Sequence, residues 1–261
     1  MPFDYYAATL PTAVSHVQAM VLESFPGTLE ASNPVRPFTH GMQHREEGFR
    51  IYHGGVNPHP FFVASGAETP RATEFIRRIY PSHRVARADV AIDTIEEGGF
   101  DRLVGIIDPI ARKAGVTVTM VGDPDDEKRT TGRTMYFGSW SSDVRLYVYE
   151  KDKEQEAKGL AFHPGHVRVE LRTKPRKDRK ALAATMDEDQ LWGLSTWTRQ
   201  VLEELDGTIV PHIPDRSMRK STATRAVEHM LDQYAGSMRA FAQEHSVEVL
   251  LARIADVLAA E

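Results

Sequence analysis

Strict alternation of polar and apolar residues marks three stretches of the chain as β-strands with one ionisable and one apolar face. The ionisable faces carry Arg145, Tyr147, Tyr149 and Lys151 on the strand over residues 144–151, Arg168, Glu170 and Arg172 on the strand over 167–172, and Arg87, Asp89 and Asp93 on the strand over 87–93. Tyrosines and cations on one side of a strand indicate a surface that meets an anion.

Elsewhere up to residue 175, the pattern of apolar residues predicts short strands that alternate with amphipathic helices. Beyond residue 175 it predicts helices only. The expected strands cover 3–8, 59–64, 116–121 and 133–137, with a hairpin over 41–52; the expected helices cover 12–23, 68–80, 100–114, interrupted near Asp108-Pro109, 151–160, 187–205, 222–244 and 247–260, and 123–129 is an acidic turn. We therefore expect an α+β fold, an antiparallel sheet with flanking helices over residues 1–180, and a helical C-terminal region over 181–261.

Composition narrows the chemistry further. The 261 residues include no cysteine, so any metal must bind to carboxylates, histidines or water. A net charge of −5 argues against a protein that coats nucleic acid by bulk electrostatics. Neither an 18-residue apolar span nor a charged-then-apolar leader is present, which predicts a cytoplasmic protein that does not contact a membrane.

Several common chemistries lack their motifs in this sequence. GxxxxGK[ST], GxGxxG after a strand, GxSxG and HExxH are all missing, which argues against ATP hydrolysis, dinucleotide chemistry and serine hydrolysis. Two histidine pairs, His40/His44 and His163/His166, suggest metal ligands, but residues four apart in a strand lie about 13 Å from each other. Turn or surface histidines are the better interpretation.

The acidic residues of the strands are candidate metal ligands. A solvated face is the usual meaning of alternating polar residues. However, Asp89 and Asp93 share a face with only Arg87 to balance them, and like charges on one face are destabilising without a cation. Carboxylates suit Mg²⁺ or Mn²⁺, and Glu170 lies between two arginines suited to phosphate. We therefore predict Asp89, Asp93 and Glu170 as ligands.

Tyr149 is the candidate nucleophile, although a half-buried strand aromatic is the commoner role of tyrosine. A phenol has a pKa near ~10 and needs activation. Lys151, on the same face, would stabilise the phenolate, and Tyr147 on that face is the reserve nucleophile.

Basic residues are concentrated from Arg168 to Lys180. A solvated loop and contact with a nucleic-acid backbone are both open interpretations of this segment. The candidate contacts are Arg145, Arg168, Arg172, Lys174, Arg176 and Lys177.

Four motifs occur in a specific order: RxDxAxD at Arg87–Asp93, GxTxYxGS at Gly132–Ser139, YxKxxE at Tyr149–Glu154 and RxE at Arg168–Glu170. In this order the chain resembles the replication initiation factor family of rolling-circle plasmids and filamentous phages. The similarity covers roughly residues 40–260, including the helical tail.

The resemblance implies a DNA strand-transferring nuclease with a palm-like antiparallel sheet over residues 1–180. Its tyrosine, Tyr149 by position, attacks a phosphodiester at the origin, forms a 5′-phosphotyrosyl bond and frees a 3′-OH primer. A divalent metal held by acidic residues of the RxDxAxD and RxE strands polarises the phosphate. The chain lacks the His-hydrophobe-His triplet of better-known rolling-circle nucleases, and Trp140 replaces an expected polar residue and offers base stacking.

The expected partners are single-stranded or cruciform origin DNA, host helicase and polymerase, and a second copy of the chain. Two rival interpretations stay open. A non-catalytic DNA-binding regulator with the same fold would form no covalent adduct, and a tyrosine recombinase or topoisomerase would place its nucleophile near a helix.

Overall fold

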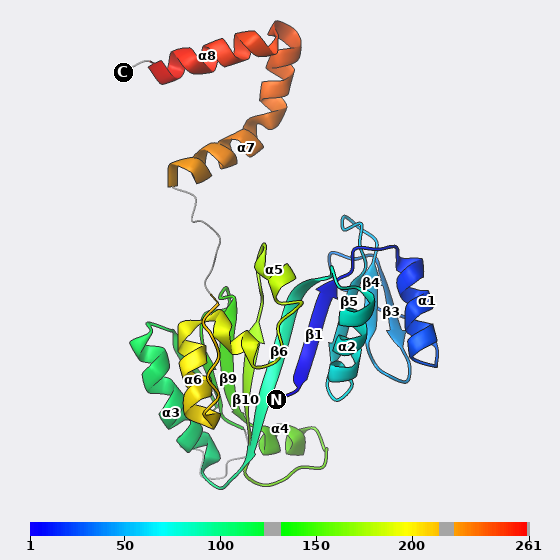
Figure 1. Ribbon diagram of the computed structural model, residues 1–261, viewed down its shortest axis with the longest axis vertical. Coiled ribbons are helices and arrows are strands. Elements are labelled where there is room, and N and C mark those ends of the chain that lie inside the picture. The colour runs from blue at the N-terminus through cyan, green and yellow to red at the C-terminus, as the bar shows by residue number, and fades with distance from the viewer. Residues whose placement is uncertain (123–131, 214–221, 260–261) are drawn as a thin grey trace. The chain divides into compact units, whose positions relative to one another are not determined.

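Ten strands form one antiparallel sheet in the computed structural model, which describes residues 1–122, 132–213 and 222–259 (Figure 1). The strand order is β2-β3-β4-β5-β1-β6-β10-β9-β8-β7. The strands are β1 (Phe3–Thr9), β2 (Leu29–Ser32), β3 (His40–His44), β4 (Arg50–His53), β5 (Phe61–Ser65), β6 (Arg84–Ile95), β7 (Val118–Val121), β8 (Thr134–Phe137), β9 (Val144–Glu150) and β10 (His166–Thr173). The expected antiparallel α+β fold is thereby confirmed.

Helices pack against one face of this sheet; no helix of the described sheet unit covers the other face, where Phe38 packs on Tyr52 and Phe61. The helices are α1 (Val14–Ser24), α2 (Thr69–Ile79), α3 (Gly99–Lys113), α5 (Arg179–Leu182), the 3₁₀ helix η1 (Gln190–Leu194) and α6 (Thr196–Asp206), while α4 (Lys151–Ala157) follows the end of β9. Apolar residues of α1, α2, α3 and α6 join the inward side chains of the strands in one core, which includes Phe62, Leu146 and Leu171. We call the opposite side the open face.

The two halves of the sheet follow the same path. In the first half β1-α1-β2-β3-β4-β5-α2 gives the order β2-β3-β4-β5-β1 from edge to centre. In the second half β6-α3-β7-β8-β9-β10-α5 gives the matching order β7-β8-β9-β10-β6, with α4 inserted between β9 and β10. The halves meet where β1 pairs with β6, so the sheet has an approximate twofold repeat.

Local sequence explains where the helices begin and end. In α2, proline occupies the first turn, where its missing N–H costs no hydrogen bond, and Ala72, Phe75 and Ile76 form the buried stripe. Helix α6 ends at Gly207, whose φ of 78° is the left-handed conformation that glycine adopts most easily.

The chain divides into two compact units, Met1–Asp215 and Arg216–Glu261. The first holds the sheet with α1 to α6; the second holds α7 (Thr222–His245) and α8 (Val247–Ala259). Residues 181–213 therefore pack with the sheet unit because Ala183, Trp192 and Val201 are buried in its core. Which part carries the catalytic role, expected for residues 1–180, stays a prediction.

Several expected elements differ in detail from the structure. The strand β2 was not expected; the helix expected over 187–205 is interrupted between η1 and α6, where Ser195 is extended. Helix α3 continues through Pro109 without the expected interruption. The acidic turn expected over 123–129 lies outside the described residues. No helix in the described ranges is both long and apolar enough for a membrane span.

Candidate active site

The three ionisable strands are neighbours in the sheet, in the order β6-β10-β9. Directly opposed residues form three rows across them: Tyr149, Arg168 and Asp93; Tyr147, Glu170 and Ala91; and Arg145, Arg172 and Asp89. Opposed residues in antiparallel strands lie on the same face with Cβ atoms about 5 Å apart. The predicted catalytic tyrosine, carboxylates and arginines therefore share the open face.

Asp89 is a buried carboxylate held between two arginines. Its side chain is 1 % exposed. Arg87 Nε donates to both Asp89 oxygens, at 3.0 and 2.9 Å, and Arg172 Nε donates to Oδ2 at 3.3 Å. Burial raises the pKa of Asp89 to about 7, against the lowering effect of the Arg87 hydrogen bonds and charge.

Replacing Asp89 with asparagine should change the pH dependence of stability. The unfolded carboxyl ionises near pH ~4, whereas the folded one stays protonated up to about 7, so its contribution to stability is full below ~4 and lost as the pH rises through 7. We expect the unfolding free energy of Asp89→Asn, relative to the unchanged protein, to increase by more than about 1 kcal/mol between pH 5 and 8.

Urea unfolding at the two pH values measures this change. Asp101→Asn, at an exposed carboxylate paired with Arg133, is the matched control. If the unfolding free energy of Asp89→Asn, relative to the unchanged protein, stays constant or decreases from pH 5 to 8, Asp89 is ionised throughout this range.

Glu170 connects Tyr149 to the arginines. The Tyr149 hydroxyl donates to Glu170 Oε2 at 3.4 Å, and Arg172 Nη2 donates to Glu170 Oε1 at 2.9 Å. Burial, and then the negative charge of Glu170, raise the pKa of Tyr149 well above its ordinary value. In this arrangement the phenol is protonated at neutral pH, and Glu170 is positioned to accept its proton.

Asp93 belongs to a separate group of charges. Arg168 donates to both Asp93 oxygens, at 2.7 and 2.9 Å, His166 Nε2 lies 2.8 Å from Oδ1, and Arg168 also donates to Asp4 at 2.8 Å. Burial raises the pKa of Asp93, but the hydrogen bonds from Arg168 and His166 outweigh that effect and lower it. This carboxylate is therefore ionised and satisfied by protein cations.

Asp4 and Tyr5 are site residues that the sequence did not indicate, and His166 was considered only as a metal ligand paired with His163. The pairing of β1 with β6 shifts register between Phe3 and Tyr5, and a shift of this kind lets successive residues turn toward one face. Alternation alone cannot show this irregularity. The ring of Tyr5 lies 4.0 Å from the Arg87 guanidinium, so β1 completes the site on the β6 side.

The three predicted metal ligands do not form one cluster. No group of three His, Asp or Glu side chains suited to a metal occurs among the described residues. Asp89 and Glu170 share Arg172 as a partner, whereas Asp93 lies four residues from Asp89, about 13 Å along the strand, and is bound by Arg168. Their role as metal ligands stays a prediction.

Lys151 does not share the strand face as predicted. It is the first residue of α4, because β9 ends at Glu150. Its ammonium lies 2.6 Å from Glu154 and 5.5 Å from the centre of the Tyr149 ring. Glu154 also pairs with Lys158 at 2.5 Å, and such pairs one turn apart favour a helix over a continued strand.

Guanidinium and aromatic groups alternate along the open face next to the tyrosines. The Arg145 guanidinium lies 3.9 Å from the Trp140 ring centre and 4.9 Å from that of Tyr147, and Arg172 lies 4.4 Å from Tyr147. Arg145 is 2 % exposed, and its Nε and Nη1 have no hydrogen-bond partner among the described residues. A buried guanidinium with unused donors is suited to a phosphate oxygen. Trp140, 74 % exposed, offers a stacking surface.

The predicted basic residues continue this surface beyond β10. Lys174, Arg176 and Lys177 are exposed. Burial, and then the positive charges of Arg87 and Arg172, lower the pKa of Lys174, which places it beside the arginines of the site. Arg176 Nε lies 2.7 Å from Asp143, so part of its charge is already paired.

The two histidine pairs act as structural residues. His44 is buried, with Nε2 3.0 Å from the Phe25 carbonyl oxygen, and cannot share a metal with the exposed His40. His166 contacts Asp93 as described above. The interpretation as turn or surface histidines fits His40 and His163, which are exposed, but not the buried His44.

Comparison with known proteins identifies a matching family and a similar solved structure. Residues 83–204 match the family described as replication initiation factor. The fold is similar to that of a rolling circle replication initiator protein from Geobacillus stearothermophilus, with a TM-score of 0.51 and 18% identity over 85% of this chain and 89% of that chain. No curated protein matches. These findings confirm the resemblance carried by the motifs: residues 83–204, which include all three ionisable strands, match the replication initiation factor family, and the fold is similar to that of a rolling circle replication initiator.

Proposed function

We propose that this protein initiates rolling-circle replication by nicking one strand of origin DNA in the cytoplasm. The observation that carries the proposal is Tyr149, which donates to Glu170 on a sheet face with Arg145, Arg168 and Arg172, all inside the family-matched region. Phosphoryl transfer needs an in-line nucleophile, a proton acceptor and positive charge around the phosphate, and these side chains supply each of them.

In the proposed reaction, the Tyr149 oxygen attacks the phosphorus of the scissile phosphodiester. Glu170 takes the phenolic proton as the oxygen–phosphorus bond forms. The bond from phosphorus to the 3′ oxygen breaks, and that oxygen takes up a proton to become the 3′-OH primer. The 5′ phosphate stays joined to Tyr149 as a phosphodiester, so bond energy is conserved for a later strand transfer.

The cations act at different positions. Arg145 has unused donors and binds a non-bridging oxygen or an adjacent phosphate. Arg168 and Arg172 already bind carboxylates, so they hold Asp93 and Glu170 in place and add positive charge. Lys151, in α4, contributes charge near the Tyr149 ring.

A divalent cation, Mg²⁺ or Mn²⁺, is part of the proposal. Asp89 and Glu170 would hold it, and it would neutralise developing charge on the phosphate. The buried Asp89 with its raised pKa becomes a carboxylate more readily when a cation binds. Host helicase and polymerase and a second copy of the chain remain predicted partners.

The test is a covalent-adduct assay. Protein is incubated with Mn²⁺ and labelled single-stranded DNA from the origin of its replicon, then run on a denaturing gel. A labelled band at the mass of protein plus DNA supports the proposal. Sequence-specific binding without that band would support the rival function, a non-catalytic regulator, which the raised pKa of Tyr149 and the arginine-paired carboxylates favour.

A further inference from the structure

The twofold repeat of the sheet gives Tyr149 a counterpart in the first half. One row of opposed residues starts at the last residue of each edge strand. In the second half the row is Val121, Thr134, Tyr149 and Arg168; in the first half it is Ser32, Gly41, Tyr52 and Phe61. Tyr52 thus occupies the position of Tyr149. Both tyrosines lie on the open face. Tyr52 opposes Phe61, which is on the same face of β5 as Ser65. Ser65 opposes Tyr5, and Tyr5 opposes Asp89, which lies on the open face.

This counterpart lacks the groups for catalysis. Phe61 occupies the position in the first half that Arg168 has in the second. In the next row on this face, Val63 occupies the position that corresponds to Glu170. The Phe38 ring packs against Tyr52 with centroids 6.2 Å apart, and Tyr52 is only 4 % exposed. The first half is therefore not a second nuclease centre.

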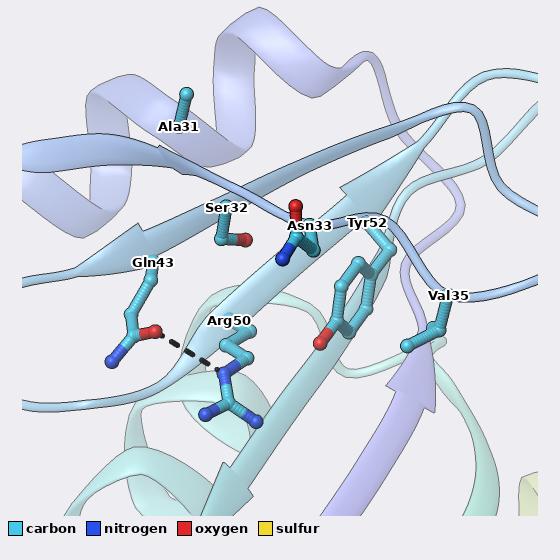
Figure 2. Close-up of a pocket in the computed structure, with 7 residues that line it drawn as sticks. All are labelled: Ala31, Ser32, Asn33, Val35, Gln43, Arg50 and Tyr52. Atoms are coloured by element: carbon cyan, nitrogen blue, oxygen red, sulfur yellow. Dashed lines mark hydrogen bonds between the residues drawn. The ribbon is translucent and has the colours of Figure 1, made fainter.

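A cavity of about 660 Å³ lies on the open face at this counterpart position. Figure 2 shows the side chains around it, which come from β2 and the residues after it, β3 and β4. It is lined by Ala31, Ser32, Asn33, Val35, Gln43, Arg50 and Tyr52. Gly41, between Ser32 and Tyr52 in the row, has no side chain to fill it, and a Cβ there would lie 2.8 Å from the Ser32 carbonyl oxygen.

The lining is rich in hydrogen-bonding groups and includes no carboxylate. Arg50 is exposed and donates through Nε to Gln43 Oε1 at 3.3 Å, which orients the guanidinium (Figure 2). The Ser32 hydroxyl is buried and has no hydrogen-bond partner among the described residues. A buried polar atom without a partner is costly, so a polar ligand that reaches Ser32 is stabilised.

We propose that this cavity binds one nucleotide of single-stranded DNA, outside the proposed nicking site. Arg50 carries the phosphate, and Gln43 and Asn33 offer amide donors and acceptors to the edge of an unpaired base. The size is in the range of small-ligand sites. The sheet that carries both sites is continuous from β9 through β1 to β4. The choice of DNA as ligand rests on the proposed function; the cavity itself lies outside the family-matched residues 83–204.

The test compares two single-charge variants of the full chain, Arg50→Gln and Arg45→Gln. Arg45 is exposed and belongs to the same hairpin, but it pairs with Glu30 and does not line the cavity. The probe is a fluorescein-labelled single-stranded DNA 20-mer of mixed sequence, and binding is followed by anisotropy without divalent metal over a series of salt concentrations.

Arg50→Gln is expected to raise the Kd about 10-fold and to reduce the salt slope by about one phosphate contact. Arg45→Gln is expected to change the Kd less than about 2-fold. An unchanged Kd in Arg50→Gln, or an equal loss in both variants, overturns the proposal. Thermal melting of both variants verifies that each is folded.

A crosslinking experiment separates this proposal from the nuclease proposal. DNA that carries 5-iodouracil is irradiated with the protein, and crosslinked peptides are identified by mass spectrometry. Crosslinks in residues 29–53 support the cavity, even if the covalent-adduct assay shows no phosphotyrosine. Crosslinks confined to residues 132–180 overturn it, even if that adduct forms.

Discussion

Replacing Tyr149 with phenylalanine is expected to abolish the covalent DNA adduct and to reduce strand nicking at least about 1000-fold. The change removes the oxygen that would form the new bond to phosphorus and leaves the ring, which is packed on the sheet. Tyr149 donates to Glu170 at 3.4 Å, so only one weak hydrogen bond is lost and the fold should be kept. The measurement is the labelled adduct on a denaturing gel.

Tyr147→Phe is the matched control. Tyr147 is two residues away on the same face, and its hydroxyl has no hydrogen-bond partner among the described residues. Its ring packs between Arg145 and Arg172, and burial raises its pKa. We expect Tyr147→Phe to retain adduct formation. If Tyr149→Phe forms the adduct and Tyr147→Phe does not, Tyr147 is the nucleophile; loss of DNA binding in Tyr149→Phe would indicate a folding defect.

Replacing Glu170 with glutamine should reduce nicking at least about 100-fold and leave DNA binding within about 3-fold. Glutamine keeps the size of the side chain and can still accept a hydrogen bond from Tyr149, but it cannot take a proton or bind a divalent cation as a carboxylate does. Since Glu170 also pairs with Arg172 at 2.9 Å, the variant leaves that arginine with Asp89 as its remaining carboxylate partner.

Single-turnover nicking and anisotropy binding measure the two effects separately. Glu96→Gln is the control, because Glu96 is exposed and pairs with Arg102 away from the site. Normal Mn²⁺-dependent nicking by Glu170→Gln would exclude Glu170 both as proton acceptor and as metal ligand. Equal loss of binding and nicking would assign Glu170 a structural role through Arg172.

The strand interpretation of residues 144–150 depended only on alternation, and the structure confirms it. Leu146 and Val148 lie in the core, and Tyr147 and Tyr149 lie on the open face. The same holds for Glu170 and Asp89, because the period of two is a property of each strand alone. The motif order was enough to indicate the family, since it depends on spacing along the chain and not on contacts.

The strand prediction was wrong for Lys151, where the alternation of the strand competes with the helix propensity of the residues that follow. Alternation placed Lys151 on the strand face, although residues 151–160 were also expected to be helical; the lysine and glutamate spacing favours the helix, and α4 begins at Lys151. The three predicted metal ligands do not cluster among the described residues, and their role as ligands stays a prediction. These residues are on the same face, but Arg168 and His166 occupy Asp93, and these partners come from a neighbouring strand.

What the sequence by itself determined is therefore which side chains of each strand share a face, and which family the ordered motifs indicate. Only the tertiary structure decided that β9, β10 and β6 lie next to each other, that Tyr149 meets Glu170, and that β1 brings Asp4 to Arg168. The structure also revealed the repeat in which Tyr52, the counterpart of Tyr149, lines a polar cavity. The physical reason is that strand alternation arises from local backbone geometry, whereas strand order and register depend on pairing between residues far apart in the chain.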